Sequence, residues 1–263
     1  MTNAQISETQ IETLTTYTQA ALVWLESCRL EWVSAAEAPY DEAILRLLRL
    51  LTTNGMSAIA LASNGLEQAP SALVLGRPCL EIGLTVKWML SAPDAQEVLR
   101  RWLGCHLEAA DWMEKVAKRS ADVGFQDQAD RWTSGATRRN ALIAKVTSSL
   151  TLDGPIKRPD VASLCRTEGL SRLYYGYQLS SQFVHGGILA SEEFYAPMKD
   201  EPVERPIAAD WLLPLSMIIW GVLFSSKAYT EHFADKVEVD PLPLERVTTF
   251  FNSISGFHEA RAT

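Results

Sequence analysis

The sequence predicts an all-α protein, a single-domain bundle of about seven to nine helices. Apolar residues recur at intervals of three and four along most segments, the period of amphipathic helices, and no sustained apolar and polar alternation indicates a strand. The 263 residues can bury one large core, and neither an internal repeat nor a low-complexity tract interrupts them. We therefore expect one domain over residues 1–263.

The first two helices are indicated by their ends as well as by their periodicity. Ser7 and Gln10 form a capping-box pattern, after which apolar residues recur at helical spacing to about Val33. The next amphipathic segment begins near Asp41 and stops at Asn64-Gly65, a pair that suits a left-handed C-cap. Two long helices are therefore expected before residue 66.

The third helix, predicted from Glu67 to about Ser91, is apolar apart from a few charged side chains. Arg77 and Glu81 are four residues apart and so share one face, where they can pair within the core. Pro78 lies inside the pattern and should kink the helix or loosen a backbone hydrogen bond. This pair is the first candidate for a polar site.

Most of the remaining helices are separated by short segments that contain Gly, Pro or Asp, the residues that begin turns and end helices. Each shows apolar residues at helical spacing. We expect helices from Ser91 to the turn at Gly124, from Asp127 to Leu150, from Val161 to Cys165, from Leu170 to Gly187, from Trp211 to about Lys236 and from Leu244 to Ala260.

The helix expected from Leu170 to Gly187 carries most of the polar chemistry. Its Tyr177, Ser181 and His185 are spaced four apart, which lines two hydroxyls and an imidazole along one side. Polar groups on a buried helix are costly unless they have partners. We therefore predict that Arg77 or Glu81 lies within hydrogen-bonding or one-water reach of these three residues.

An acidic loop is expected from Ser191 to Asp210, where several acidic residues alternate with prolines. It follows directly after His185. We predict that Phe194 or Tyr195 packs over the end of the preceding helix, or onto a dimer partner, and restricts access to His185. The alternative is a surface crossover that plays no part in a site.

Composition excludes several classes of function. The net charge of −8 argues against a broad electrostatic grip on nucleic acid, and no DNA partner is expected. The four cysteines show no Cys-x-x-Cys pair, and no histidine has a glutamate three residues before it, so no metal site is predicted. No Gly-rich phosphate loop or Gly-x-Ser-x-Gly elbow is found, and no cofactor is expected.

The chain is expected to be cytoplasmic, with reduced cysteines packed as small apolar residues. Its polar N-terminus has no basic region followed by an apolar one. The apolar stretch from Trp211 to Ser226 is shorter than the roughly 20 residues that a spanning helix needs. It therefore predicts a buried central helix, and no membrane partner is expected.

Two groups of residues resemble a bacterial helical family catalogued only as a domain of unknown function. In its pattern an apolar helix ends in Gly, here Gly65, and an Arg-x-x-x-Glu helix closes on a Trp, here Trp88. The Tyr-x-x-x-Ser-x-x-x-His helix completes it, and together these motifs cover roughly a fifth of the chain. The resemblance implies the helical fold and the positions of a site, and it implies no activity. More weakly, Arg101 and His106 match the Arg, four to six residues, His motif of HEPN ribonucleases.

Two classes of function remain open. In a metal-independent, HEPN-like ribonuclease or related anion-processing enzyme, Arg77 would stabilise phosphate charge and His185 would transfer the proton. Tyr177 and Ser181 would orient His185 or the ligand, and Glu81 would orient Arg77. The alternative is a non-catalytic ligand-binding or protein-interaction module, in bacterial stress or defence, with a purely structural polar cluster. A small anionic ligand or RNA is the candidate partner, and apolar residues on the first helix also predict a homodimer.

Overall fold

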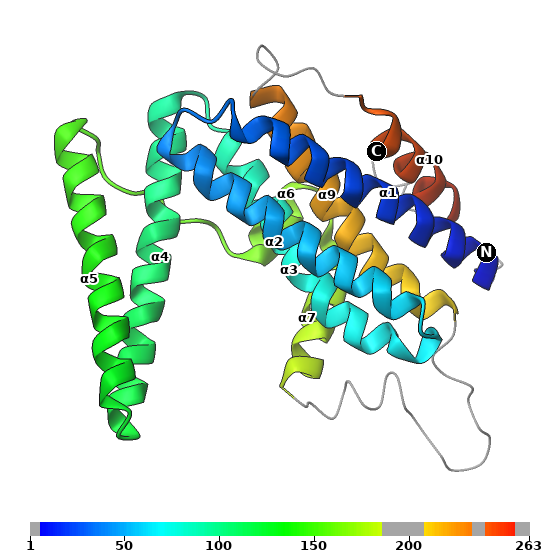
Figure 1. Ribbon diagram of the computed structural model, residues 1–263, viewed down its shortest axis with the longest axis horizontal. Coiled ribbons are helices and arrows are strands. Elements are labelled where there is room, and N and C mark those ends of the chain that lie inside the picture. The colour runs from blue at the N-terminus through cyan, green and yellow to red at the C-terminus, as the bar shows by residue number, and fades with distance from the viewer. Residues whose placement is uncertain (1–5, 186–207, 233–239, 256–263) are drawn as a thin grey trace. The chain divides into compact units, whose positions relative to one another are not determined.

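The computed structural model describes residues 6–185, 208–232 and 240–255, and all regular structure within them is helical (Figure 1). These residues form nine α-helices and two short 3-10 helices, which confirms the predicted fold class. The elements are α1 (Glu8–Val33), α2 (Pro39–Ala62), η1 (Leu66–Gln68), α3 (Ala69–Leu90), α4 (Ala95–Asp122), α5 (Gln126–Ser149), α6 (Val161–Thr167), α7 (Ser171–Val184), η2 (Ala208–Trp211), α9 (Leu212–His232) and α10 (Leu242–Ser255).

The chain divides into two compact units, one made of residues 1–87 and 160–263 and the other of residues 88–159. The expectation of a single domain stays a prediction.

The core of the first unit is built around α9. More than half of its residues are buried, and α1, α2, α7 and α10 all pack against it. The predicted buried central helix is therefore confirmed. Both α2 and α9 are long and apolar enough to cross a membrane, but 72% of the apolar window of α9 is buried inside the protein, as in the core helix of a globular unit.

Glycines allow α3 and α9 to approach at backbone distance. A Cβ placed on Gly83 would lie 2.5 Å from the carbonyl oxygen of Gly221, and a Cβ on Gly221 would clash with the carbonyl group of Cys79. On α7, a Cβ on Gly176 would clash with the side chain of Leu213 on α9. These contacts fix α3 and α7 against the same central helix, and both carry predicted site residues.

The ends of several helices follow the sequence signals. The Ser7 N–H donates to the Gln10 side-chain oxygen at 2.9 Å, and the Gln10 N–H donates to the Ser7 hydroxyl at 3.2 Å, which completes the predicted capping box. Helix α3 runs through Pro78 without interruption. Asp41 lies in the first turn of α2, where its carboxylate accepts the backbone N–H groups of Glu37 and Ala38.

The second unit is a hairpin of α4 and α5 with the loop that follows it (Figure 1). Asp94 caps α4 by accepting the Glu97 N–H at 2.8 Å, and Gly124 makes the turn with a φ of +82°. The loop returns to α4, where the Ile156 N–H donates to the Arg100 carbonyl at 3.0 Å. Both predicted helices and the predicted turn are confirmed.

Some predictions fall on residues outside the described ranges. They include the acidic segment as far as residue 207, with Phe194 and Tyr195, and the glycines predicted to end the helix after His185. Within the described part, Ala208–Trp211 forms η2 and leads directly into α9. The predictions of a covering loop over His185 and of helix ends beyond His232 and Ser255 therefore stay predictions.

Candidate functional site

Three of the five predicted site residues meet between α3 and α7. The Tyr177 hydroxyl accepts a hydrogen bond from Arg77 Nη2 at 3.2 Å and donates one to Glu81 Oε2 at 3.0 Å. The guanidinium carbon of Arg77 also lies 4.4 Å from the centre of the Tyr177 ring. The prediction that the two motifs converge is confirmed.

The local sequence explains why these groups meet. Arg77 and Glu81 are separated by one helical turn and so present both side chains to the same neighbour. Tyr177 follows Gly176, whose missing side chain lets α7 approach α9, and α3 approaches α9 at Gly83. The close packing of both helices on α9 therefore sets the separation that the three side chains bridge.

The electrostatics of this Arg77–Tyr177–Glu81 network favour a neutral phenol between two charged groups. All three residues are half-buried. Burial raises the pKa of Tyr177 above its ordinary value, and the negative charge of Glu81 acts in the same direction, whereas the Arg77 hydrogen bond opposes both. The hydroxyl stands between guanidinium and carboxylate, and among the described residues Arg77 forms no direct ion pair.

Ser181 and His185 are not part of this network. Ser181 is half-buried one turn beyond Tyr177, and His185 is the exposed C-cap of α7, where its backbone N–H donates to the Ser181 carbonyl. Among the described contacts, no hydrogen bond links either side chain to the other three residues. A helix rises 1.5 Å per residue, which separates the Tyr177 and His185 backbones by about 12 Å along the axis.

Sequence reasoning missed polar and aromatic groups near the network. Tyr174 stacks on Tyr177 with ring centres 5.9 Å apart, a contact that the spacing of three residues on one helix could have predicted. Lys87, further along α3, forms an ion pair with Glu168 and lies 4.7 Å from the centre of the Phe224 ring. No sequence pattern links these last three residues, because they come from separate segments.

The Arg101 and His106 motif does not form a shared site. Arg101 pairs with Glu97 and donates to the Trp88 carbonyl, whereas His106 Nδ1 lies 2.8 Å from Arg139 Nη1. Burial lowers the pKa of His106, and the neighbouring positive charge of Arg139 lowers it further. The neutral imidazole therefore accepts a hydrogen bond that joins α4 to α5, and Arg101 serves a different contact.

The remaining candidate chemistry is that of metals and thiols. In the described part of the chain, no group of three or more His, Cys, Asp or Glu side chains could hold a metal ion. Cys28, Cys79 and Cys165 are buried as small core residues, as the sequence predicts, and Cys105 is partly buried. Burial raises the pKa of the Cys79 thiol to about 12, which keeps it protonated and unreactive.

Comparison with known proteins identifies one family. The model of a family of unknown function, DUF5677, matches residues 41–201, a range that contains both the Arg77 and the Tyr177 motifs. The resemblance drawn from the sequence is therefore confirmed. No curated protein and no solved structure matches the chain.

Proposed function

The chain belongs to the DUF5677 family of unknown function, and from the geometry of its polar residues we propose that it is a non-catalytic interaction module. In this proposal the Arg77–Tyr177–Glu81 network is structural and holds α3 and α7 together. The surfaces that the helices present to partners, rather than a reacting group, then perform the function.

The observation that carries the proposal is that the Tyr177 hydroxyl makes hydrogen bonds to both Arg77 and Glu81. A phenol can donate one hydrogen bond, and Tyr177 donates it to Glu81. The same hydroxyl oxygen accepts a hydrogen bond from Arg77. The hydroxyl therefore has no proton to donate to a substrate unless the bond to Glu81 breaks. A hydroxyl bonded to both residues of the opposite helix is what a helix-to-helix link requires.

The placement of the proton-transfer candidate gives further support. A general acid or base has to lie about 2.6–3.2 Å from its proton partner, or one water away. His185 is exposed at the far end of α7, about 12 Å along the helix axis from Tyr177. Within one protomer, Arg77 and His185 are therefore poorly placed to act on one phosphate.

The test is a nuclease assay with the purified full-length chain. Wild type and His185→Ala are incubated with pooled RNA in the presence of a chelator, at matched folding by circular dichroism. We expect equal, background cleavage by the two proteins, because the proposal assigns no reacting group to His185. Cleavage by wild type that is lost in His185→Ala would overturn the proposal.

A HEPN-like ribonuclease is the second candidate, favoured by the exposure of His185 at the end of α7. An accessible imidazole can reach a group supplied from outside the protomer, and the half-buried Arg77 can offer its remaining N–H groups to phosphate oxygens. This candidate predicts that Arg77→Lys and His185→Ala both abolish cleavage at a temperature where both variants are folded. The interaction module predicts lower stability for the Arg77 variant and the same background cleavage for wild type and both variants.

A further inference from the structure

Helices α1 and α2 form an exposed groove on the first unit. Val23 and Leu30 of α1 line it together with Met56 and Arg49 of α2, and its volume is about 640 Å³. The pairing of early α1 residues with late α2 residues shows that the helices are antiparallel. Val23 is 52% exposed and Leu30 is 60% exposed, so the groove leaves large apolar side chains in contact with solvent.

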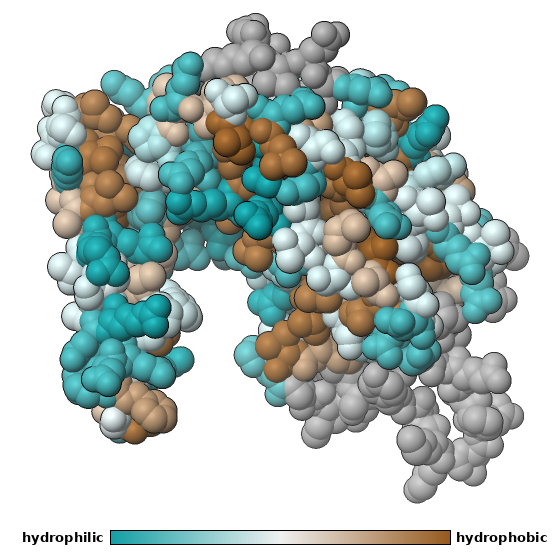
Figure 2. All heavy atoms as spheres, in the orientation of Figure 1, coloured by the Kyte–Doolittle hydropathy of each residue, from teal (hydrophilic) through white to brown (hydrophobic). Residues whose placement is uncertain are grey.

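Apart from Glu26 and Arg49, which line the groove, the surface of α1 and α2 around it contains almost no charge. Between Glu12 and Glu26, α1 has no charged residue, and none occurs between Arg49 and Glu67, a stretch that covers the second half of α2. Charged residues make up 21% of the whole chain, and their depletion is typical of the centre of a protein interface. Figure 2 shows pale and brown residues over the middle of these helices. We call this surface the uncharged face, with the exposed residues Thr16, Gln19, Ala20, Val23, Ser27, Leu30, Thr53, Ser57 and Ala60.

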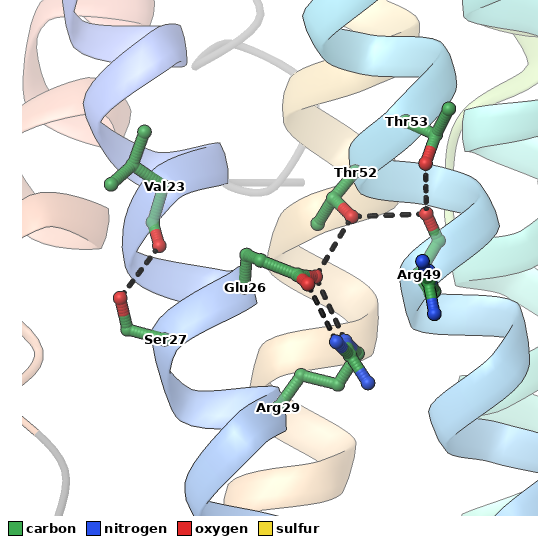
Figure 3. A network of polar contacts seen from close by, with 7 residues as sticks. All are labelled: Val23, Glu26, Ser27, Arg29, Arg49, Thr52 and Thr53. Carbon is green, nitrogen blue, oxygen red and sulfur yellow. Dashed lines mark hydrogen bonds and ion pairs between the residues drawn. The ribbon is translucent and has the colours of Figure 1, made fainter.

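The carboxylate inside the groove already has partners (Figure 3). Glu26 accepts from Arg29 Nε at 2.8 Å and Nη2 at 2.6 Å, and from the Thr52 hydroxyl at 3.1 Å. The Arg29 hydrogen bond is the main reason why the pKa of Glu26 is lowered. A partner can therefore cover the groove without burying an unpaired charge.

Opposite charges mark the two ends of the uncharged face. Arg49 is exposed beside Leu30 at one end, and Glu8 and Glu12 lie near Ser63 at the other. Arg49 makes no side-chain hydrogen bond or ion pair to a described residue. Glu12 and Leu30 are 18 residues apart along α1, which separates the two ends by about 27 Å.

We propose that the uncharged face is the interface of a homodimer, in which α1 and α2 of two copies pack antiparallel as a four-helix bundle. A two-fold axis through the middle of the face brings Arg49 of each copy to the Glu12 end of the other, whereas a parallel arrangement would oppose like charges. The inference goes beyond the proposed function and does not depend on it, since no residue of the Arg77–Tyr177–Glu81 network takes part.

A second copy fits this surface better than a lipid bilayer does. In hydrocarbon, the exposed Gln19 amide would lose its hydrogen bonds to water. The Thr16, Thr53 and Ser57 hydroxyls donate to carbonyls of their own helices, but their oxygens would lose the water that they accept from. In a protein interface such groups can pair across the two copies or retain bridging water. Small residues such as Ala20, Ser57 and Ala60 also let helices approach closely.

The first experiment measures mass. Sedimentation equilibrium of the full chain at micromolar concentration should give twice the monomer mass of 29.2 kDa. Val23→Asp should give the monomer mass with an unchanged helical spectrum, because it places a charge at the centre of the face. The matched control is Val184→Asp on α7, since Val184 is 53% exposed and lies outside the face. A monomeric wild type, or a Val23→Asp protein that stays dimeric, would overturn the proposal.

The second experiment tests the orientation by exchanging charges. At low salt, Arg49→Glu and Glu12→Arg should each raise the dimer Kd about tenfold, and the double variant should return it to within about threefold of wild type. Within one chain the two positions are about 27 Å apart, well beyond a Debye length. Recovery of the dimer affinity in the double variant therefore has to come from contacts between the two copies. If the increases in dimer Kd caused by the two single substitutions add in the double variant, the antiparallel arrangement is wrong. Flotation of monomeric wild type with phosphatidylcholine–phosphatidylglycerol vesicles would assign the face to a membrane instead.

Discussion

Replacing Tyr177 with Phe tests whether the polar network stabilises the fold. The substitution retains the ring, and with it the Arg77 contact at 4.4 Å and the stacking on Tyr174 at 5.9 Å. It removes only the hydroxyl that bonds Arg77 at 3.2 Å and Glu81 at 3.0 Å. Any loss of stability can therefore be assigned to those two hydrogen bonds.

The expected magnitude follows from the partners and from their exposure. A hydrogen bond to a charged group contributes about 1.5–3 kcal/mol when buried, and solvent reduces this because all three residues are half-buried. Once the hydroxyl is gone, Arg77 and Glu81 can pair directly on α3, which returns about 0.3–0.5 kcal/mol. We expect Tyr177→Phe to lower the free energy of unfolding by about 1–2 kcal/mol, or Tm by roughly 2–8 °C.

The assay combines thermal and urea denaturation followed by circular dichroism. Tyr175→Phe is the matched control, because Tyr175 lies on the same helix, is 60% exposed and should leave Tm unchanged. A double-mutant cycle with Glu81→Gln should give a coupling energy of about 1 kcal/mol. If Tyr177→Phe and Tyr175→Phe unfold alike, the network does not hold α3 to α7, and the structural role assigned to it is wrong.

Two further predictions concern other contacts of the fold. Burial alone would raise the pKa of Asp41, but hydrogen bonds from His232, Ala38 and Glu37 hold that pKa below its usual value. The stability that these bonds contribute is present above about pH 4 and is lost as pH falls through the folded-state pKa. Urea midpoints should therefore fall more steeply below pH 4 for wild type than for Asp41→Asn, and parallel curves would exclude this linkage. Gly83→Ala should lower the free energy of unfolding by about 1–3 kcal/mol, because its Cβ would meet backbone atoms of α9, whereas Gly135→Ala, which meets only the flexible Met113 side chain, should be near neutral in the same urea titration.

Local signals in the sequence predicted most helix ends. The Ser7 and Gln10 side chains cap α1, Asp94 caps α4 and Gly124 makes the turn before α5. Each of these signals acts within four residues, so it depends little on the rest of the fold. Pro78 shows the limit of such reasoning, because α3 continues through it and packs at Gly83 against α9.

The candidate site was predictable only in part. Apolar surroundings required partners for Arg77 and Glu81, and so the meeting with Tyr177 followed from the sequence. Which groups bond directly depends on the separation of α3 and α7, and that separation is set by glycine contacts with α9. Residues spaced four apart also drift around the helix, because one turn takes 3.6 residues. Over the eight residues from Tyr177 to His185 the rotation reaches about 80°. The imidazole therefore need not share the side of the helix that faces α3.

The two proposals differ in how many of their residues lie within the family match. Residues 41–201 include α3 and α7, so the Arg77–Tyr177–Glu81 network belongs to the segment that defines the family. Helix α1, which supplies half of the uncharged face, precedes that segment, and α9, the core of the first unit, follows it. The α1 half of the proposed dimer interface therefore lies outside the matched segment, whereas most of the α2 half lies within it. A fragment of residues 41–201 would also lose the helix on which α3 and α7 pack, and so the full chain is the form in which both proposals have to be tested.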